Sequence, residues 1–180
     1  MSGIETSEAI LEKKVLSKEQ KTTVVKMLGE FLIMKYHHHA AHKESKQLLE
    51  TADKLCSLFI AELGDQHDLY IDAVYLQSKA LFVNAVPQMS VNVDKLDKAL
   101  SNLDAVIAYY KKQTKPKLLQ YAMCVILQAT INKHILQEAE AVRGFLKAGK
   151  IIMKIEKTLS IEMMVQNILK EIEETKSRYK

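Results

Sequence analysis

The amino-acid sequence predicts an all-α fold of about seven helices packed in antiparallel pairs. Apolar residues recur at spacings of three and four along most of the 180 residues, which is the helical period. Strong chain breaks occur only at Gly64, Pro87 and Pro116. The chain has five glycines and two prolines, whereas a β-sandwich or barrel needs turn residues about every 8 to 12 positions. We expect a short N-terminal helix or arm at residues 1–16 and a single all-helical domain at residues 17–180.

The first long helices have recognisable ends. Ser17, followed three residues later by Gln20, has the pattern of a capping box, so a helix is expected from residue 18 to the high thirties. The polar residues 37–45 predict a tight break after it. The next apolar stripe ends at Gly64, which suits the C-terminal cap of a helix.

Five further helices are expected in the rest of the chain. Apolar residues fall on most faces of residues 69–85, and residues 93–110 carry one narrow apolar seam. Residues 118–127 are apolar all round, so we expect them to form the most buried helix. Helices at residues 136–155 and 161–179 complete the set. Because neighbouring helices joined by short linkers pack antiparallel, they form pairs that recur at about 40 to 48 residues.

The first helix pair carries part of a known repeat pattern. Leu28 and Gly29, then Leu32 and the downstream Ala41, match the Leu-Gly-x-x-Tyr and Ala positions of that pattern over about twenty residues. In this segment the chain resembles the tetratricopeptide repeat family. The resemblance implies a stacked array of helical hairpins that binds other proteins through a groove and performs no catalysis. An irregular helical bundle is the alternative arrangement.

Cysteine use and hydropathy indicate the environment of the protein. Cys56 and Cys124 each lie in an apolar helical pattern, so we expect buried free thiols in a reducing compartment. The N-terminus lacks the features of a signal peptide, and no apolar run approaches the ~18 residues of a membrane span. A cytoplasmic or nuclear location without a membrane span is expected.

Basic residues concentrate in the second half of the chain. Twelve basic and five acidic residues lie from Lys95 to Lys157, a balance of +7 in a chain whose total is +4. Five of the basic residues recur at spacings of four, three, four and three, which places them on one face of one helix. Four more flank Pro116. Together they form the predicted partner-binding face: Arg143, Lys147, Lys150, Lys154, Lys157, Lys111, Lys112, Lys115 and Lys117.

A histidine cluster is the second candidate site. His37, His38, His39 and His42 are close in sequence, and His38 and His42 are one helical turn apart. Two imidazoles so spaced can share a transition-metal ion, but a stable site needs further ligands that the sequence does not indicate. We therefore predict no resident metal, with His38 and His42 as weak candidates on a solvated helix end or turn.

The sequence has none of the common catalytic motifs, so we expect neither catalytic residues nor a cofactor. The favoured function is a non-catalytic adaptor or scaffold that binds another protein, one with an acidic segment, as part of a larger complex. The alternative is RNA or single-stranded DNA binding through residues 95–157, which have few arginines and few aromatic residues to stack on bases. A third reading is a metal-binding protein that uses the histidine cluster.

Overall fold

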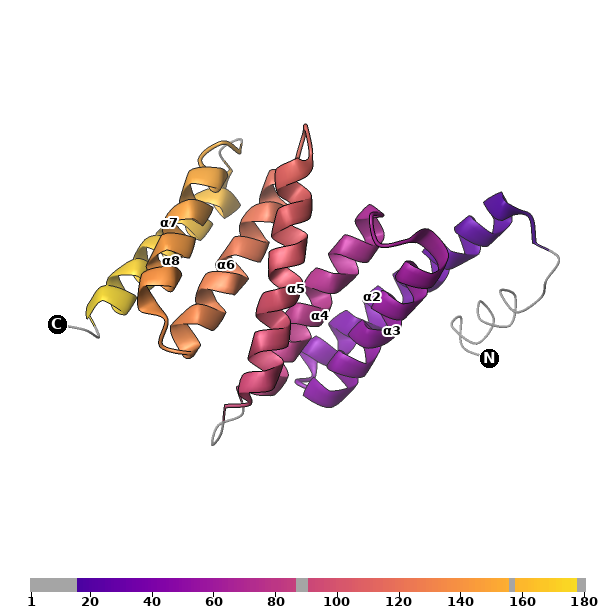
Figure 1. Cartoon of the computed structure of the whole chain (residues 1–180), viewed down its shortest axis with the longest axis horizontal. Coiled ribbons are helices and arrows are strands. Elements are labelled where there is room, and N and C mark those ends of the chain that lie inside the picture. The colour runs from indigo at the N-terminus through magenta and orange to yellow at the C-terminus, as the bar shows by residue number, and fades with distance from the viewer. Residues whose placement is uncertain (1–15, 87–90, 156–157, 178–180) are drawn as a thin grey trace. The chain divides into compact units, whose positions relative to one another are not determined.

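The computed structural model describes residues 16–86, 91–155 and 158–177 and confirms the all-α prediction. Within these residues it has seven helices and no strand (Figure 1). Two compact units divide the chain between Lys95 and Leu96, and we describe each by itself. The predicted N-terminal arm lies outside the described residues except for its last position, Leu16. None of the described helices combines the length and hydropathy needed to cross a membrane.

Unit 1 contains α2 (Lys18–Ala41), α3 (Ser45–Leu63) and α4 (Asp68–Ala85). The predicted capping box is present: Ser17 Oγ accepts a hydrogen bond from the Gln20 amide, and Gln20 Oε1 accepts one from the Ser17 amide. The expected helix end in the high thirties was wrong, since α2 continues through Ala41. The polar side chains of His37, His38 and His39 do not interrupt a helix that contains no glycine or proline there. The break is confined to residues 42–44, where Lys43 has a φ of 58°.

Close packing of α2 on α3 depends on a small residue. A Cβ atom added to Gly29 would overlap the Phe59 ring, and Phe59 is buried. Leu28, Gly29 and Leu32 are buried on α2, whereas Ala41 is the exposed last residue of the same helix. All four residues of the tetratricopeptide-like pattern therefore lie on one helix, and the family resemblance stays a prediction.

A buried tyrosine links α2 to α4. The Tyr36 hydroxyl donates a hydrogen bond of 3.1 Å to the Leu76 carbonyl oxygen. Its ring packs in a buried cluster with Leu48, Ala52 and Ala80, so all three helices share one core. Burial raises the pKa of the Tyr36 hydroxyl well above its ordinary value. As predicted, α3 ends at Gly64, whose φ of 86° suits a residue without a Cβ atom.

Unit 2 contains most of α5 (Val93–Lys112), then α6 (Leu118–His134), α7 (Glu138–Ile152) and α8 (Leu159–Ser177). The seam of α5 is buried at Leu96, Leu103 and Ile107, as expected. The prediction that residues 118–127 form the most buried helix was wrong, because Leu119 is 40% exposed and α4 buries more residues than α6. Because apolar residues fall on most faces of residues 118–127, their pattern did not show which face of α6 meets the core.

Helix α7 is shorter than predicted at both ends. Leu136 adopts a left-handed φ of 62°, so α7 begins at Glu138, and it ends at Ile152 rather than Ile155. Residues 161–177 of the predicted last helix belong to α8, and its predicted end at residue 179 lies outside the described residues.

Close contacts and an ion-pair network hold α7 and α8 in place. On the face of α7 toward α6, an added Gly144 Cβ would lie 2.8 Å from the Ala129 Cβ, so the two helices approach closely. The Lys133 ammonium of α6 lies 2.7 Å from Glu171 and 3.4 Å from Glu174, both on α8. The Lys133 side chain is only 12% exposed, so this network also fixes the packing of α8.

The same side-chain hydrogen bond joins two different helix pairs. Gln77 of α4 donates to Asp53 of α3 at 2.6 Å, and Gln128 of α6 donates to Asp104 of α5, also at 2.6 Å. Asp104 and Gln128 lie 51 residues after Asp53 and Gln77, respectively. At the same spacing, the buried positions of the two pairs largely coincide. Four further side chains are identical at this spacing: Leu49 and Leu100, Tyr70 and Tyr121, Val74 and Val125, and Leu76 and Leu127.

Candidate interaction surface

Three side chains connect the ends of α5, α6 and α7 in unit 2. The rings of Tyr110, near the end of α5, and Tyr121, in the first turn of α6, stack with centroids 6.0 Å apart. The Lys147 ammonium of α7 lies over the Tyr121 ring, 5.5 Å from its centroid. A cation at this distance is attracted by the negative face of the ring. The contacts therefore place the C-terminal ends of α5 and α7 beside the N-terminal end of α6.

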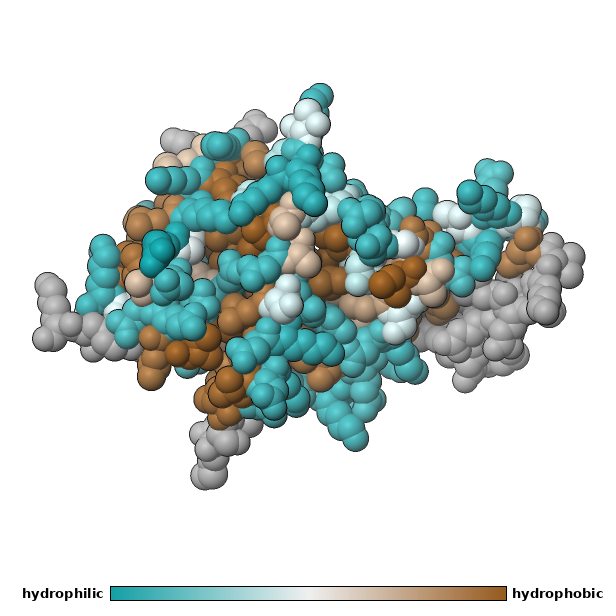
Figure 2. Space-filling model, viewed as in Figure 1, coloured by the Kyte–Doolittle hydropathy of each residue, from teal (hydrophilic) through white to brown (hydrophobic). Residues whose placement is uncertain are grey.

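Seven described lysines gather around these contacts, and we call them the basic end. Lys111 and Lys112 follow Tyr110 directly, and Lys150 lies about one turn after Lys147. All seven except the half-buried Lys147 are exposed. In Figure 1 the α5–α6 linker and the C-terminal end of α7 point the same way, and Figure 2 shows hydrophilic side chains gathered at the linker. The basic end consists of Lys111, Lys112, Lys115, Lys117, Lys147, Lys150 and Lys154.

Helix stabilisation explains only part of this charge. Lysines at the last turns of α5 and α7 complement the negative end of each helix dipole. Lys117, in contrast, is the N-cap residue of α6, and the first turn of α6 has no acidic residue. Positive charge is unfavourable at the N-terminus of a helix. The lysines of the linker therefore have no role in stabilising α6 through its dipole.

The corresponding turn of unit 1 has the opposite charge. The positions that lie 51 residues before the α5–α6 linker include Asp65, and Asp68 follows in the first turn of α4. The N-cap residue there is His67, whose Nδ1 accepts a hydrogen bond from the Leu69 amide. Acidic residues and an N-cap acceptor stabilise the start of a helix. The α3–α4 turn therefore stabilises the start of α4, whereas the α5–α6 linker has neither feature at the start of α6.

The structure changes part of the predicted basic stripe. Lys147 and Lys150 lie on α7, but Lys154 follows the helix end, so the five residues do not share one helix face as predicted. Lys157 lies outside the described residues. Arg143 is exposed on α7, and its guanidinium donates a 2.8 Å hydrogen bond to Glu140 on the same helix. The basic surface is therefore formed by neighbouring ends of α5, α6 and α7 and not by one face of a single helix.

Sequence reasoning did not identify the tyrosines of this site. Tyr110 was predicted only as the last residue of the apolar seam at residues 93–110, and it is indeed buried, whereas Tyr121 is half-buried beneath Lys147. The recurrence of a tyrosine at positions 70 and 121, with glutamine seven residues later in each case, was the available signal.

The histidine cluster is placed at the end of α2. The rings of His38 and His42 lie 4.2 Å apart, but His42 Nδ1 donates a 2.8 Å hydrogen bond to the His38 carbonyl oxygen. His39 Nδ1 donates to Glu44 Oε2 at 2.5 Å, and this hydrogen bond lowers the pKa of the Glu44 carboxyl. Across the described ranges no three His, Cys, Asp or Glu side chains are arranged to hold a metal ion.

The prediction of buried thiols is confirmed, since Cys56 and Cys124 are both buried and neither forms a disulfide bond. Compared with known proteins, the sequence matches no protein-family model and no curated protein.

Proposed function

We propose that this chain is a non-catalytic adaptor or scaffold that binds another protein through the basic end, and that the partner contributes an acidic segment. The observation that supports this proposal is the concentration of seven lysines where α5 and α7 end and α6 begins. Charges of one sign on neighbouring elements add to a potential that attracts and orients a partner of opposite charge. Among the described residues close to the basic end, Glu162 in the first turn of α8 is acidic.

A repeated architecture supports this function. We propose that α3–α4 and α5–α6 are two copies of one helical hairpin, because they share the Asp–Gln hydrogen bond, the four identical side chains and their buried positions at one spacing. Repeated hairpins form extended surfaces on which positions outside the core are free to differ. The acidic turn of one copy and the basic linker of the other differ in this way, and the folding of the hairpin does not require the lysines of the linker.

The aromatic residues favour a peptide over a nucleic acid. Single-stranded nucleic acids bind through bases that stack on accessible aromatic faces. Tyr110 is 3% exposed, and Lys147 covers the ring of Tyr121. The lysines thus remain accessible to carboxylates, whereas neither ring offers an open face to a base. Binding of RNA or single-stranded DNA through the same lysines is the competing outcome of the test below.

The test is a titration of the full chain against two fluorescent probes at low salt. One is a twelve-residue peptide of alternating glutamate and serine, and the other is a twelve-nucleotide single-stranded RNA. We expect the peptide to bind, and the variant Lys150→Glu/Lys154→Glu to weaken its binding by about tenfold, because two attractive charges become repulsive. Stronger binding of RNA than of peptide would overturn the proposal.

A matched control separates local from overall charge. Lys98 and Lys176 are exposed lysines of unit 2, near the N-terminal end of α5 and the C-terminal end of α8. The variant Lys98→Glu/Lys176→Glu makes the same change in net charge as the first variant. It should leave peptide binding within about twofold of the parent chain. Equal weakening by both variants would show non-specific attraction and would contradict a binding surface at the basic end.

A further inference from the structure

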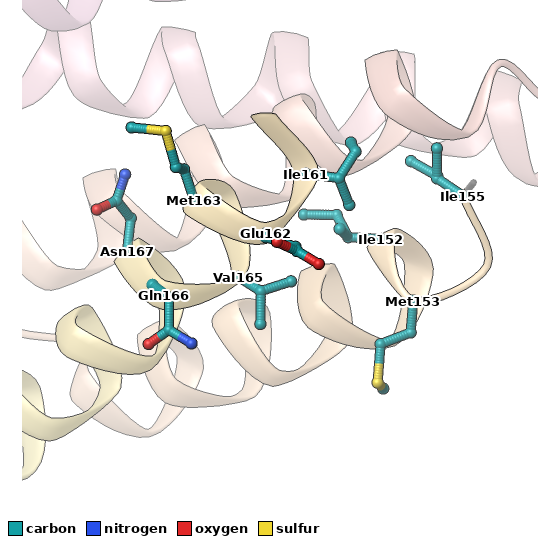
Figure 3. Close-up of a pocket in the computed structure, with 9 residues that line it drawn as sticks. All are labelled: Ile152, Met153, Ile155, Ile161, Glu162, Met163, Val165, Gln166 and Asn167. Carbon is teal, nitrogen blue, oxygen red and sulfur yellow. The ribbon is translucent and has the colours of Figure 1, made fainter. Parts of the chain in front are cut away.

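A pocket lies beside the basic end, between α7 and α8. Its volume is about 780 Å³. Ile152 and Ile161 in its lining are buried, while Met153 at the end of α7 and Met163 on α8 are 72% and 60% exposed. Figure 3 shows these side chains on the two helices that border the pocket, and Figure 2 shows hydrophobic side chains reaching the surface over α7 and α8. The lining consists of Ile152, Met153, Ile155, Ile161, Glu162, Met163, Val165, Gln166 and Asn167.

The charges around the pocket are asymmetric. Lys154 lies between Met153 and Ile155, both of which line the pocket, and Lys150 precedes them by about one turn. Glu162 is the carboxylate of the lining, and it lies in the first turn of α8, where negative charge suits the helix dipole. An acidic partner is therefore attracted on the α7 side of the pocket and repelled near Glu162.

We infer that the pocket receives the apolar side chains of the acidic segment, which binds as an amphipathic helix. This inference rests on the proposed function, because it places the apolar face of the same partner. An amphipathic helix presents two large apolar side chains one turn apart and leaves its other face for charged residues. A volume of about 780 Å³ falls within the ~300–1,000 Å³ typical of binding pockets, which is room for both.

The chemistry of the lining suits this occupant. Methionine side chains are flexible and polarizable, so Met153 and Met163 can adjust around leucine, phenylalanine or methionine of a partner. Apolar anchors in a pocket, surrounded by polar contacts, commonly supply most of the binding energy of a protein interface. The lysines of the basic end would then set the orientation of the partner, and the pocket would supply affinity.

The test compares two synthetic peptides bound to the full chain. Both are glutamate-rich and helix-forming with the same net charge; one has two leucines four positions apart, and the other has alanine in their place. We expect the leucine peptide to bind at least about tenfold more tightly. If both peptides bind equally well, the pocket inference fails and the proposed function stands. If neither peptide binds, the proposed function fails and the pocket inference falls with it.

Three variants of α8 test where the peptides bind. Gln166→Trp adds a large ring to the exposed lining of the pocket, whereas Leu169→Trp adds one at an exposed position outside the lining. We expect only the first to remove the advantage of the leucine peptide, and Glu162→Gln to tighten binding of both peptides. Circular dichroism melts confirm that each variant is folded. If Gln166→Trp still binds the leucine peptide more tightly than the alanine peptide, the inference is overturned. It is also overturned if the parent chain forms a concentration-dependent dimer that Gln166→Trp abolishes, because a second copy of the chain would then occupy the pocket.

Discussion

The Lys147 ammonium lies over the ring of Tyr121, 5.5 Å from its centroid, and so joins α7 to the first turn of α6. This contact explains how lysines that are about 30 residues apart in sequence form one surface. We expect a coupling energy of about 0.5 to 1 kcal/mol between the two side chains. A double-mutant cycle of Lys147→Gln and Tyr121→Leu, with the free energies of unfolding measured by chemical denaturation, gives this coupling energy. Additive effects of the two substitutions would contradict the contact.

The two glycines of α7 should respond oppositely to the same substitution. A Cβ at position 144 would lie 2.8 Å from the Ala129 Cβ, which is fixed to the α6 backbone, whereas a Cβ at position 149 meets nothing within 4 Å. Gly144→Ala should cost about 1 to 3 kcal/mol because the helices must separate. Gly149→Ala should gain about 0.5 to 1 kcal/mol from helix propensity. Thermal and urea unfolding give both values, and effects of the same sign would contradict the packing.

The His39–Glu44 hydrogen bond should make stability depend on acidic pH. The bond lowers the pKa of the Glu44 carboxyl in the folded chain, so ionised Glu44 favours folding. This contribution is present above the unfolded-state pKa of about 4.5 and is lost as pH falls through the lower folded-state value. The stability difference between the parent chain and Glu44→Gln should therefore shrink as pH falls from 5.5 to 3.

Glu30 provides a comparison on the same part of the chain, since it is exposed on α2. Melting temperatures of the parent chain, Glu44→Gln and Glu30→Gln, recorded across this pH range, separate a local effect from a general response to acid. A difference between parent and Glu44→Gln that does not change with pH would count against the hydrogen bond.

The two Asp–Gln pairs should contribute equally if α3–α4 and α5–α6 are copies of one hairpin. Each is an exposed side-chain hydrogen bond of 2.6 Å between neighbouring helices. Cycles with Asp53→Ala and Gln77→Ala, and with Asp104→Ala and Gln128→Ala, should each give about 0.5 to 1.5 kcal/mol of coupling. The two values should agree within about 0.5 kcal/mol. Coupling in one pair only would argue against a common unit.

The sequence predicted those features of the fold that depend on local patterns. The capping box at Ser17, the end of α3 at Gly64 and the seam of α5 all follow from short-range signals, and the structure confirms them. The predicted end of α2 was wrong because its histidines do not interrupt the helix, and the predicted start of α7 was wrong because Leu136 adopts a left-handed φ that a leucine does not signal. Residues 118–127 have apolar side chains on most faces, so their pattern does not show which side of α6 meets the core.

The candidate site could be predicted as a set of residues but not as a surface. Lysine spacing predicted a stripe along one helix, whereas the surface forms from the ends of three. That arrangement depends on long-range contacts such as the stacking of Tyr110 on Tyr121, which no local pattern contains. The pocket between α7 and α8 has the same origin, because its lining comes from both helices.

The salt dependence of peptide binding tests the central claim most directly. Lys111, Lys112 and Lys115 are exposed at the basic end, and Lys98, Lys170 and Lys176 are exposed elsewhere in unit 2. For the parent chain, binding of the glutamate-serine peptide should weaken by about fivefold or more from 50 to 200 mM salt. Replacing the first three lysines by glutamine should weaken binding at low salt and flatten this dependence, while replacing the second three should change neither. The same response in both triple variants, or none in either, would contradict an acidic partner at the basic end.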